Sequence, residues 1–255
     1  MSNFSYFAFK TIIFTEIKTY LKQFQFNIIA PLINTLLFVF IFSAISKYYI
    51  SENKSVTYID FLIPGILMTV VFQSGFNHLS EVIISMKQCG SFNDYLVSPI
   101  SRVEIFISFL TSSIFLCIIV GIVNLIALSY FLDFSKINLL NSLYYLILAI
   151  IAFSSLGAMV GFLSYTWDSQ SLVSTFFIVP LGFFSGSFFS IDALNNNLKF
   201  IFEYNPLYYL VMGFRSSFTE IDYITFENHI FIILFVFTIF FLSLFVFKKG
   251  YGVIN

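Results

Sequence analysis

Six long stretches of the sequence contain no Asp, Glu, Lys or Arg, and they constrain the fold more than any other feature. They cover residues 23–46, 61–80, 105–132, 137–167, 169–191 and 228–247. A charge at the centre of a bilayer costs about 2.5–3.5 kcal/mol on insertion scales, and about 20 helical residues cross the hydrocarbon core. Charged residues make up only 10% of the chain, whereas a soluble domain carries about a quarter. The chain is therefore predicted to be an all-α integral membrane protein with six transmembrane helices.

The positions of the charges also predict the extent of each span. We expect a single transmembrane domain over residues 1–255, with one large connector, residues 85–103, on the side of the two termini. The spans are placed approximately at 27–46, 61–84, 105–132, 139–164, 169–190 and 228–247.

The N-terminal 22 residues are predicted to form an interfacial helix that lies in the headgroup plane. Lys18 and Lys22 lie four residues apart on one stripe of this helix, as expected for its polar face. An amphipathic tail without a mechanical role is the alternative. The apolar side chains recur at helical spacing on another stripe, at Phe14, Ile17, Leu21 and Phe24.

The distribution of Lys and Arg predicts the orientation in the membrane. An even number of spans places both termini on one side, together with connector 85–103. That side carries seven Lys and Arg residues, and the other side carries five. Because short cytosolic loops hold the excess of positive charge, both termini are predicted to be cytoplasmic.

Residues 192–227 are predicted to form an outer re-entrant or interfacial helical hairpin before the last span. The segment holds five acidic residues, but also an uncharged stretch, 204–214, that is too short to cross. Asn205 and Pro206 mark the point where a helix breaks or starts, since proline is tolerated in the first helical turn. A plain amphipathic loop is the alternative.

Arg215 follows this uncharged stretch and has two possible roles. It either contacts an anionic headgroup of a substrate, or it has a structural role at the membrane interface or with Glu203 or Glu220. The structural role is favoured.

Several classes of function lack the residues they need. A net charge of −1 without a run of Lys or Arg provides no footprint for nucleic acid. Neither histidine has a second ligand at metal-binding spacing, and no paired-carboxylate or hydrolase motif is found. We therefore predict no catalytic, metal-binding or cofactor-binding residues. His78 and Glu81 share a helix face, which is interpreted as a polar contact near the membrane interface.

The sequence also predicts that the protein does not power transport by itself. The six uncharged stretches contain no obvious proton relay. The Gly-Lys-Ser/Thr element that cradles nucleotide phosphates is absent as well. If the chain is part of a pump, its motor is another polypeptide.

Connector 85–103 is the candidate contact for such a motor. Gly90 interrupts the preceding helix, and Pro99 ends the connector before the third span. Ser91 or Asn93 can cap a short transverse helix between them. An apolar helix in the groove of a partner is a recurrent binding mode, and an ordinary surface turn is the equally weighted alternative. The side chains expected to be available for docking are Phe92, Tyr95, Leu96 and Val97.

Four motifs occur in order between about residues 56 and 220. They are Tyr58-Ile59-Asp60-Phe61-Leu62-Ile63-Pro64-Gly65; Asp94-Tyr95-Leu96-Val97-Ser98-Pro99-Ile100-Ser101-Arg102; Thr166-Trp167-Asp168 with Pro180, Gly186 and Phe188-Phe189-Ser190; and Asn205-Pro206-Leu207-Tyr208-Tyr209 with Phe214-Arg215. Together they resemble the membrane subunit of ABC-2 type transporters, in its bacterial exporter branch. The corresponding family patterns include Y-x-x-F-L-x-P-G, E-L-L-x-[ST]-P-[IV]-S and N-P-[IL]-x-Y. Asp94, Ser174 and Tyr165 depart from the family's usual Glu, Pro and basic residue, which leaves the subgroup open.

The resemblance implies a permease subunit in the bacterial plasma (inner) membrane. It implies two copies of the permease and two ABC ATP-binding subunits, which bind and hydrolyse ATP with Mg²⁺ and drive a lipid, glycan or drug-like substrate out of the cytoplasm. The chain itself is then not an enzyme. The implied ATPase-coupling residues are Phe92, Asp94, Tyr95, Leu96, Pro99 and Arg102, and the outer re-entrant segment is marked by Asn205, Pro206 and Arg215.

Two other classes of function stay open at this point. A membrane scaffold or assembly protein would share the six spans but would need no ATPase. An ion-coupled secondary carrier would depend on His78, Glu81 or Asp168.

Overall fold

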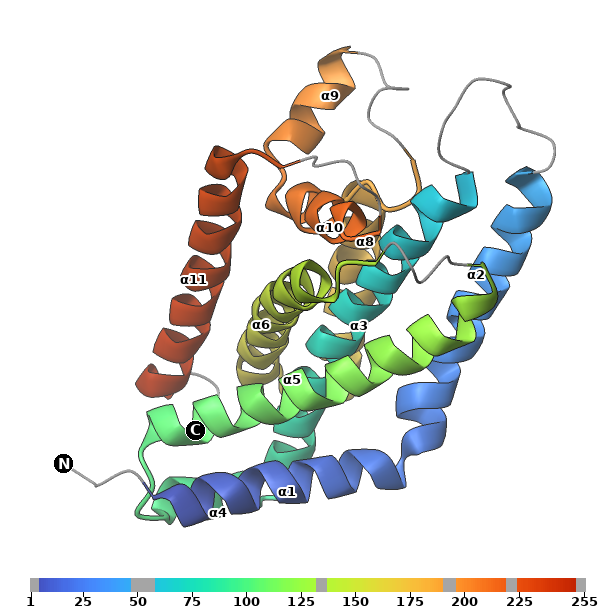
Figure 1. Cartoon of the computed structure of the whole chain (residues 1–255). Helices are drawn as coiled ribbons and strands as arrows, with labels where there is room; N and C mark the ends of the chain where they lie inside the picture. The colour runs from blue at the N-terminus through green and yellow to red at the C-terminus, as the bar shows by residue number, and fades with distance from the viewer. Residues whose placement is uncertain (1–4, 47–57, 132–136, 190–195, 219–223, 251–255) are drawn as a thin grey trace.

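A computed structural model describes residues 5–46, 58–131, 137–189, 196–218 and 224–250 (Figure 1). These ranges are helical and contain no strand. The helices are α1 (Tyr6–Lys22), α2 (Ala30–Ser46), α3 (Tyr58–Gln88), α4 (Phe92–Val97), α5 (Arg102–Ala127), α6 (Leu139–Leu163), α7 (Trp167–Val173), α8 (Val179–Phe184), α9 (Asn196–Glu203), α10 (Pro206–Ser216) and α11 (Phe226–Lys249). Three further turns are η1 (Gln25–Ile29), η2 (Ser129–Phe131) and η4 (Ser174–Ile178).

Within the described ranges, five helices are long and apolar enough to cross a membrane. They are η1 continued by α2, then α3, α5, α6 and α11, and they match five of the predicted spans to within a few residues at most ends. The third predicted span is too long, because α5 ends at Ala127 and a 3-10 turn follows. Residue 132 lies outside the described ranges. The prediction of an all-α integral membrane protein is confirmed.

The fifth predicted span, 169–190, is an interrupted helix. α7, η4 and α8 follow one another from Trp167 to Phe184, with a π turn just before Pro180, which has no N–H to donate. Residue 190 is outside the described ranges. The stretch is shorter and more polar than the five long helices, so the count of six spans stays a prediction.

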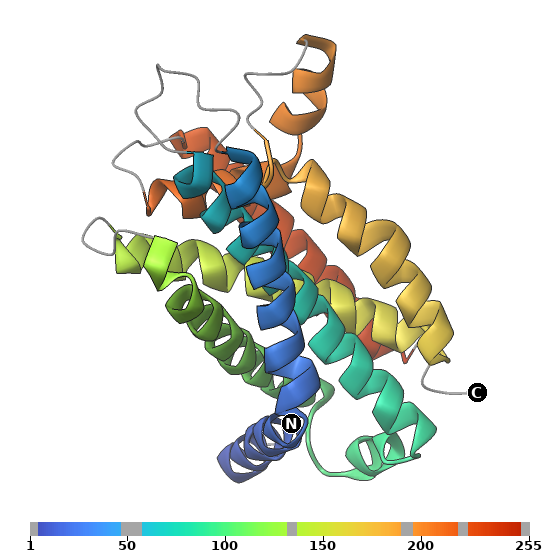
Figure 2. The same ribbon diagram turned by 90° about the vertical axis from the view of Figure 1, so that its right-hand side faces the viewer.

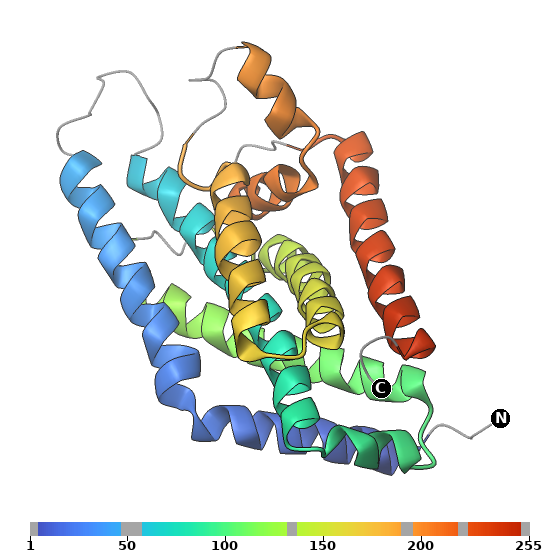
Figure 3. The same cartoon turned by 180° about the vertical axis from the view of Figure 1, so that it is seen from behind.

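Contacts at its two ends show that this stretch nevertheless runs the length of the molecule. At the start, Trp167 Nε1 donates a hydrogen bond of 2.6 Å to Gln88 Oε1 at the end of α3. At the finish, Phe184 O accepts a bond of 2.8 Å from Asn205 Nδ2, next to α10. Figure 3 shows α8 rising towards α10. The path therefore agrees with six crossings.

α1 lies across one end of the bundle, at an angle to α2, as predicted for an interfacial helix (Figures 1 and 2). The predicted apolar stripe faces away from the protein, where it is available to lipid: Phe14, Leu21 and Phe24 are exposed and Ile17 is half-buried. The face that packs on the bundle has a different set of side chains, Ile12, Glu16 and Tyr20.

Two hydrogen bonds hold the corner between α1 and α2. Tyr20 Oη donates to Asn27 O, and Asn27 Nδ2 donates to Tyr20 O, both at 3.1 Å. The π turn η1 lies within this corner. The angle between the two helices is therefore set by side-chain bonds as well as by the backbone.

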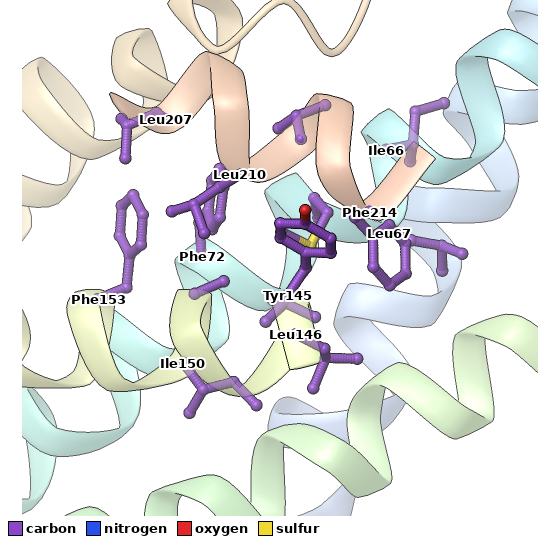
Figure 4. Packing of buried hydrophobic residues seen from close by; sticks show 14 of the residues in the cluster. Ile66, Leu67, Phe72, Tyr145, Leu146, Ile150, Phe153, Leu207, Leu210 and Phe214 are labelled. Carbon is purple, nitrogen blue, oxygen red and sulfur yellow. The ribbon is translucent and has the colours of Figure 1, made fainter. Parts of the chain in front are cut away.

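α3 and α6 cross at the centre of the molecule with almost no space between their backbones. A Cβ atom on Gly157 would lie 2.1 Å from Phe76 O, and one on Gly161 would also crowd α3. The rings of Phe72 and Phe153 stack beside this crossing, with centroids 4.2 Å apart (Figure 4). Small residues that let helices approach are typical of membrane proteins, in which packing drives helix association.

α9 and α10 form the predicted helical hairpin. α10 enters the bundle and packs on α3, α6 and α11, whereas α9 exposes Phe200 and Ile201, and Tyr204 directly after it is exposed too. Figure 4 shows three side chains of α10 directed at the core: Leu207, Leu210 and Phe214.

Both ends of the described chain meet the start of α5. Ser5 N donates to Glu104 Oε1 at 3.3 Å, and Arg102 Nη1 donates to Lys248 O. This end of the molecule, called the α4 end below, also holds α1 and α4, while α9 and α10 lie at the opposite α10 end (Figure 1). The two predicted cytoplasmic termini, residues 1–4 and 251–255, lie outside the described ranges.

Candidate coupling site and neighbouring cavity

α4 is the short transverse helix predicted within connector 85–103. Gly90 has φ of +73°, a left-handed conformation that glycine adopts without strain, and it separates α3 from α4. Ser91 occupies the N-cap position without a side-chain capping bond. At the other end Ser98 is extended and Pro99 follows it. These are the breaks that the sequence predicts.

Phe92 attaches α4 to the bundle, and its side chain is only 3% exposed. Its ring centroid lies 6.2 Å from that of Phe162 on α6 and 6.1 Å from that of Phe247 on α11. Those two rings stack on each other at 4.7 Å. The expectation that Phe92 is available for docking is therefore corrected, because its ring is directed into the core that joins the ends of α6 and α11.

Other side chains form the exposed surface of the connector. Val97 is 85% exposed, and Tyr95 is half-buried with its ring 5.7 Å from that of Phe109 on α5. Burial raises the pKa of the Tyr95 phenol above its ordinary value, and Glu16 and Asp94 act in the same direction. The side chain of Leu96 lies outside the described part of the structure. From α4 onwards, the exposed residues that the structure describes in the connector are Asn93, Asp94, Val97, Pro99 and Arg102.

Two basic side chains donate hydrogen bonds to the C-terminal ends of helices at this end of the molecule. Lys87 Nζ donates to the last carbonyl groups of α6, with 2.9 Å to Gly161 O and 3.1 Å to Ser164 O. Arg102 reaches the penultimate carbonyl of α11. Such positions favour a positive charge, since helix C-termini carry unpaired carbonyl groups. Lys87 was not predicted as a site residue, although a lysine in the last turn of α3 was a visible signal.

Asn205 and Pro206 start α10 as predicted. Asn205 Oδ1 accepts a bond of 3.0 Å from Leu207 N, and Pro206 is the first helical residue. The amide of Asn205 also ties α10 to Phe184 at the end of α8.

Arg215 is buried at the α10 end, with 1% of its surface exposed. Its guanidinium donates to Phe61 O at 3.1 Å, Gly186 O at 3.2 Å and Ser187 O at 3.4 Å. It also lies over the Phe61 ring, with Cζ 3.6 Å from the centroid. These contacts favour the structural role over contact with a headgroup. Glu220, one suggested partner, lies outside the described ranges.

A cavity of about 630 Å³ with both polar and apolar walls lies beside α4, between α1, the start of α2 and α3. Glu16, His78 and Glu81 line it together. The sequence interpretation gave His78 and Glu81 only a polar contact, and it missed Glu16. Ile12, Glu16 and Tyr20 recur every four residues, which was the available signal. Spacing alone does not tell which stripe of a helix is buried, so Glu16 was not singled out.

Asp168 is exposed at the start of α7, and Thr166 caps that helix through a bond of 3.3 Å from Ser169 N. Within the described ranges, no group of three or more His, Cys, Asp or Glu residues is placed to hold a metal ion.

The model of the ABC-2 type transporter family matches residues 7–219 of the chain. The match includes α1, α4 and α10. The chain belongs to the ABC-2 type transporter family.

Curated relatives of this ABC-2 protein agree with the family match. The inner membrane transport permease YadH of Escherichia coli K12, of E. coli O157:H7 and of Shigella flexneri is in each case 25% identical over 222 residues. The alignments cover 87% of this chain and 87% of each relative.

Family membership defines the general role of this ABC-2 protein. It is the membrane subunit of an ABC transporter and a multi-pass protein of the inner membrane, and the family implies an ABC ATP-binding partner. Its α4 and α10 elements are therefore parts of a transport machine.

Proposed function

We propose that this ABC-2 permease is the exporter subunit of a transporter built from two copies of the chain and two ATP-binding subunits. The complex moves a lipid, glycan or drug-like molecule out of the cytoplasm, and the partner subunits bind and hydrolyse ATP with Mg²⁺. The α4 end faces the cytosol and receives the partners. The excess of Lys and Arg on this side supports that orientation.

One observation carries the proposal: α4 is exposed on one face and locked to the core on the other. Val97 is directed outwards, while Phe92 packs on Phe162 and Phe247. Aromatic rings packed at the density of a protein interior do not compress. A partner that pushes on α4 therefore displaces the ends of α6 and α11, which is how closure of an ATPase can reach the membrane helices.

The test places a charge on the exposed face of α4. Val97→Asp should weaken co-purification with the ABC ATP-binding partner by about tenfold and abolish permease-dependent stimulation of ATP hydrolysis, since an apolar contact loses its desolvation gain. Tyr130→Asp is the matched control, because Tyr130 is 91% exposed beyond the far end of α5. Val97 is preferred to Tyr95, whose substitution would also disturb packing on Phe109.

Unchanged association and unchanged ATP hydrolysis in Val97→Asp would contradict the coupling role of α4. A membrane scaffold predicts that no ATP-binding subunit co-purifies with the wild-type chain. An ion-coupled carrier predicts that neutralising His78, Glu81 and Asp168 together stops transport.

A further inference from the structure

The cavity beside α4 has the size of a small-molecule site, about 630 Å³. It brings together α1, the corner to α2, the middle of α3 and α4, elements that are distant in the sequence. Its polar side chains include Glu16, Tyr20, Asn27, Asn34, Gln73, Asn77, His78, Glu81 and Tyr95.

The charged side chains described in the wall of this cavity are acidic. Glu16 and Glu81 both line it, and the described residues that form its wall include no Lys or Arg. Glu16 is only 5% exposed. Burial of a carboxylate is unfavourable unless an opposite charge or several hydrogen-bond donors compensate for it. A phosphate or another anion would be repelled, whereas a cation would offset the burial of both acids.

His78 contributes its ring to the wall of the cavity. It is 4% exposed, and within the described part of the structure neither Nδ1 nor Nε2 has a hydrogen-bond partner. Its ring meets the edge of Tyr20, with centroids 5.1 Å apart. Both ring nitrogens are enclosed by the protein, so the His78 ring adds to the wall of the cavity, and the charged contacts of a ligand are left to Glu16 and Glu81.

The remaining wall identifies the class of ligand. Apolar surface is contributed by Phe26, Val70, Met86 and Trp167. A bare metal ion does not fit, because the described acids and His78 do not form a metal-binding group. The ligand that matches all these features has a positive charge, N–H donors and an apolar body.

We propose that this cavity binds an organic cation, a protonated amine on an apolar ring or chain, with Glu16 and Glu81 holding the charge. The assignment of this ligand as a transported substrate rests on the proposed export function. Tyr95 and Ser91 of α4 line the same cavity, so displacement of α4 changes the site that holds the cation.

The experiment measures binding to the purified full-length permease in nanodiscs, without an ATPase. Rhodamine 123 is the cationic probe with amino groups, and fluorescein is its anionic counterpart on the same ring system. Fluorescence anisotropy should show saturable binding of rhodamine 123 above that of empty nanodiscs, and none of fluorescein. Trp167 is the only tryptophan of the chain and lines the cavity, so rhodamine 123 should quench its emission, which locates the probe.

Variants then test the residues. Glu16→Gln and Glu81→Gln should each weaken rhodamine 123 binding several-fold, and the double variant should weaken it at least about tenfold. Glu203→Gln is the control, because Glu203 is an exposed carboxylate on α9 at the opposite end. Size-exclusion profiles verify that each variant is folded, and the single variants replace the double variant if that one is not.

Binding of both dyes with equal affinity, absence of saturable binding, or unchanged affinity in Glu16→Gln and Glu81→Gln would overturn the proposal. None of these results depends on the ATPase. A transporter that fails to export with its ATPase present would refute the proposed function, even if rhodamine 123 still bound as expected.

Discussion

Arg215 is a charged side chain buried among apolar helices, and main-chain carbonyl oxygens of two other segments accept its hydrogen bonds. Phe61 belongs to the first turns of α3, and Gly186 and Ser187 follow α8. A single guanidinium thus joins α10 to α3 and to the chain after α8, because its planar group can donate hydrogen bonds to several acceptors at once.

Arg215→Ala should therefore lower the stability of the permease by about 2–4 kcal/mol, because buried carbonyl groups lose their donors. Arg215→Lys should recover only part of this, since one ammonium group cannot replace the fork. Thermal unfolding in detergent measures both. Lys199→Ala on α9 is the control. Full stability of Arg215→Ala, combined with a loss of transport, would instead favour a direct contact with substrate.

Glu16 predicts how stability depends on pH. Burial raises the pKa of this carboxyl from 4.5 to about 7. The folded protein therefore holds a proton that the unfolded chain has released, which contributes up to about 3 kcal/mol below pH 4.5 and is lost as the pH rises through about 7. Between about pH 5 and pH 8 the melting temperature should fall more for the wild type than for Glu16→Gln.

The other titratable groups around Glu16 do not obscure this comparison. Tyr20 and Tyr95 face the same cavity and stay neutral, since burial raises the pKa of both phenols. His78 and Glu81 are present in both proteins and cancel. Parallel pH profiles for the wild type and Glu16→Gln would show that Glu16 is not buried as described.

At the scale of helices, the crossing of α3 and α6 depends on the absence of side chains. Gly157 faces the backbone of α3, with the Phe76 carbonyl oxygen 2.1 Å from where a Cβ would lie. Gly121 on α5 is different, because its nearest neighbour would be Leu146 Cδ1 at 3.5 Å, an ordinary contact. The two glycines therefore form a matched pair.

Gly157→Ala should destabilise the protein by about 1–3 kcal/mol, since the two helices must separate to admit one methyl group. Gly121→Ala should be neutral or slightly stabilising, because alanine favours the helical backbone. Thermal unfolding of the two variants side by side gives the comparison, and equal effects would argue against the close approach of α3 and α6.

At the scale of the whole molecule, the two native cysteines make the topology measurable. Cys89 is exposed at the α4 end and Cys117 is buried in α5. A membrane-impermeant maleimide should label Cys89 in inverted vesicles and not in spheroplasts, and Cys89→Ser should remove the signal. Tyr204→Cys, made in the Cys89→Ser background, should show the opposite pattern, because Tyr204 is exposed next to α10.

This pair also tests the interrupted stretch α7–η4–α8. Three crossings separate Cys89 from Tyr204 if that stretch spans the membrane, and two if it does not. Labelling of both positions from the same side would therefore show that the count of six spans is wrong.

The sequence predicted the local features of the fold better than the functional side chains. The breaks at Gly90, Pro99 and Asn205-Pro206 were predictable, because glycine and proline restrict the backbone wherever they occur. The orientation of Phe92 was not predictable, because the sequence of a short helix is the same whether its aromatic residue faces a partner or the core. Glu16 was missed for a related reason: helical spacing identifies stripes but does not tell which one is buried.

The sequence by itself determined that the chain is a helical membrane protein. Whether a segment can enter a bilayer depends on the charged residues within that segment alone, so this property can be judged for each segment separately. Only the tertiary structure decided which polar groups are brought together. The burial of Arg215 beneath three carbonyl groups, and the meeting of Glu16, His78 and Glu81 around one cavity, depend on contacts between helices far apart in the chain. Such contacts follow from close packing in three dimensions, which the order of residues along one helix does not encode.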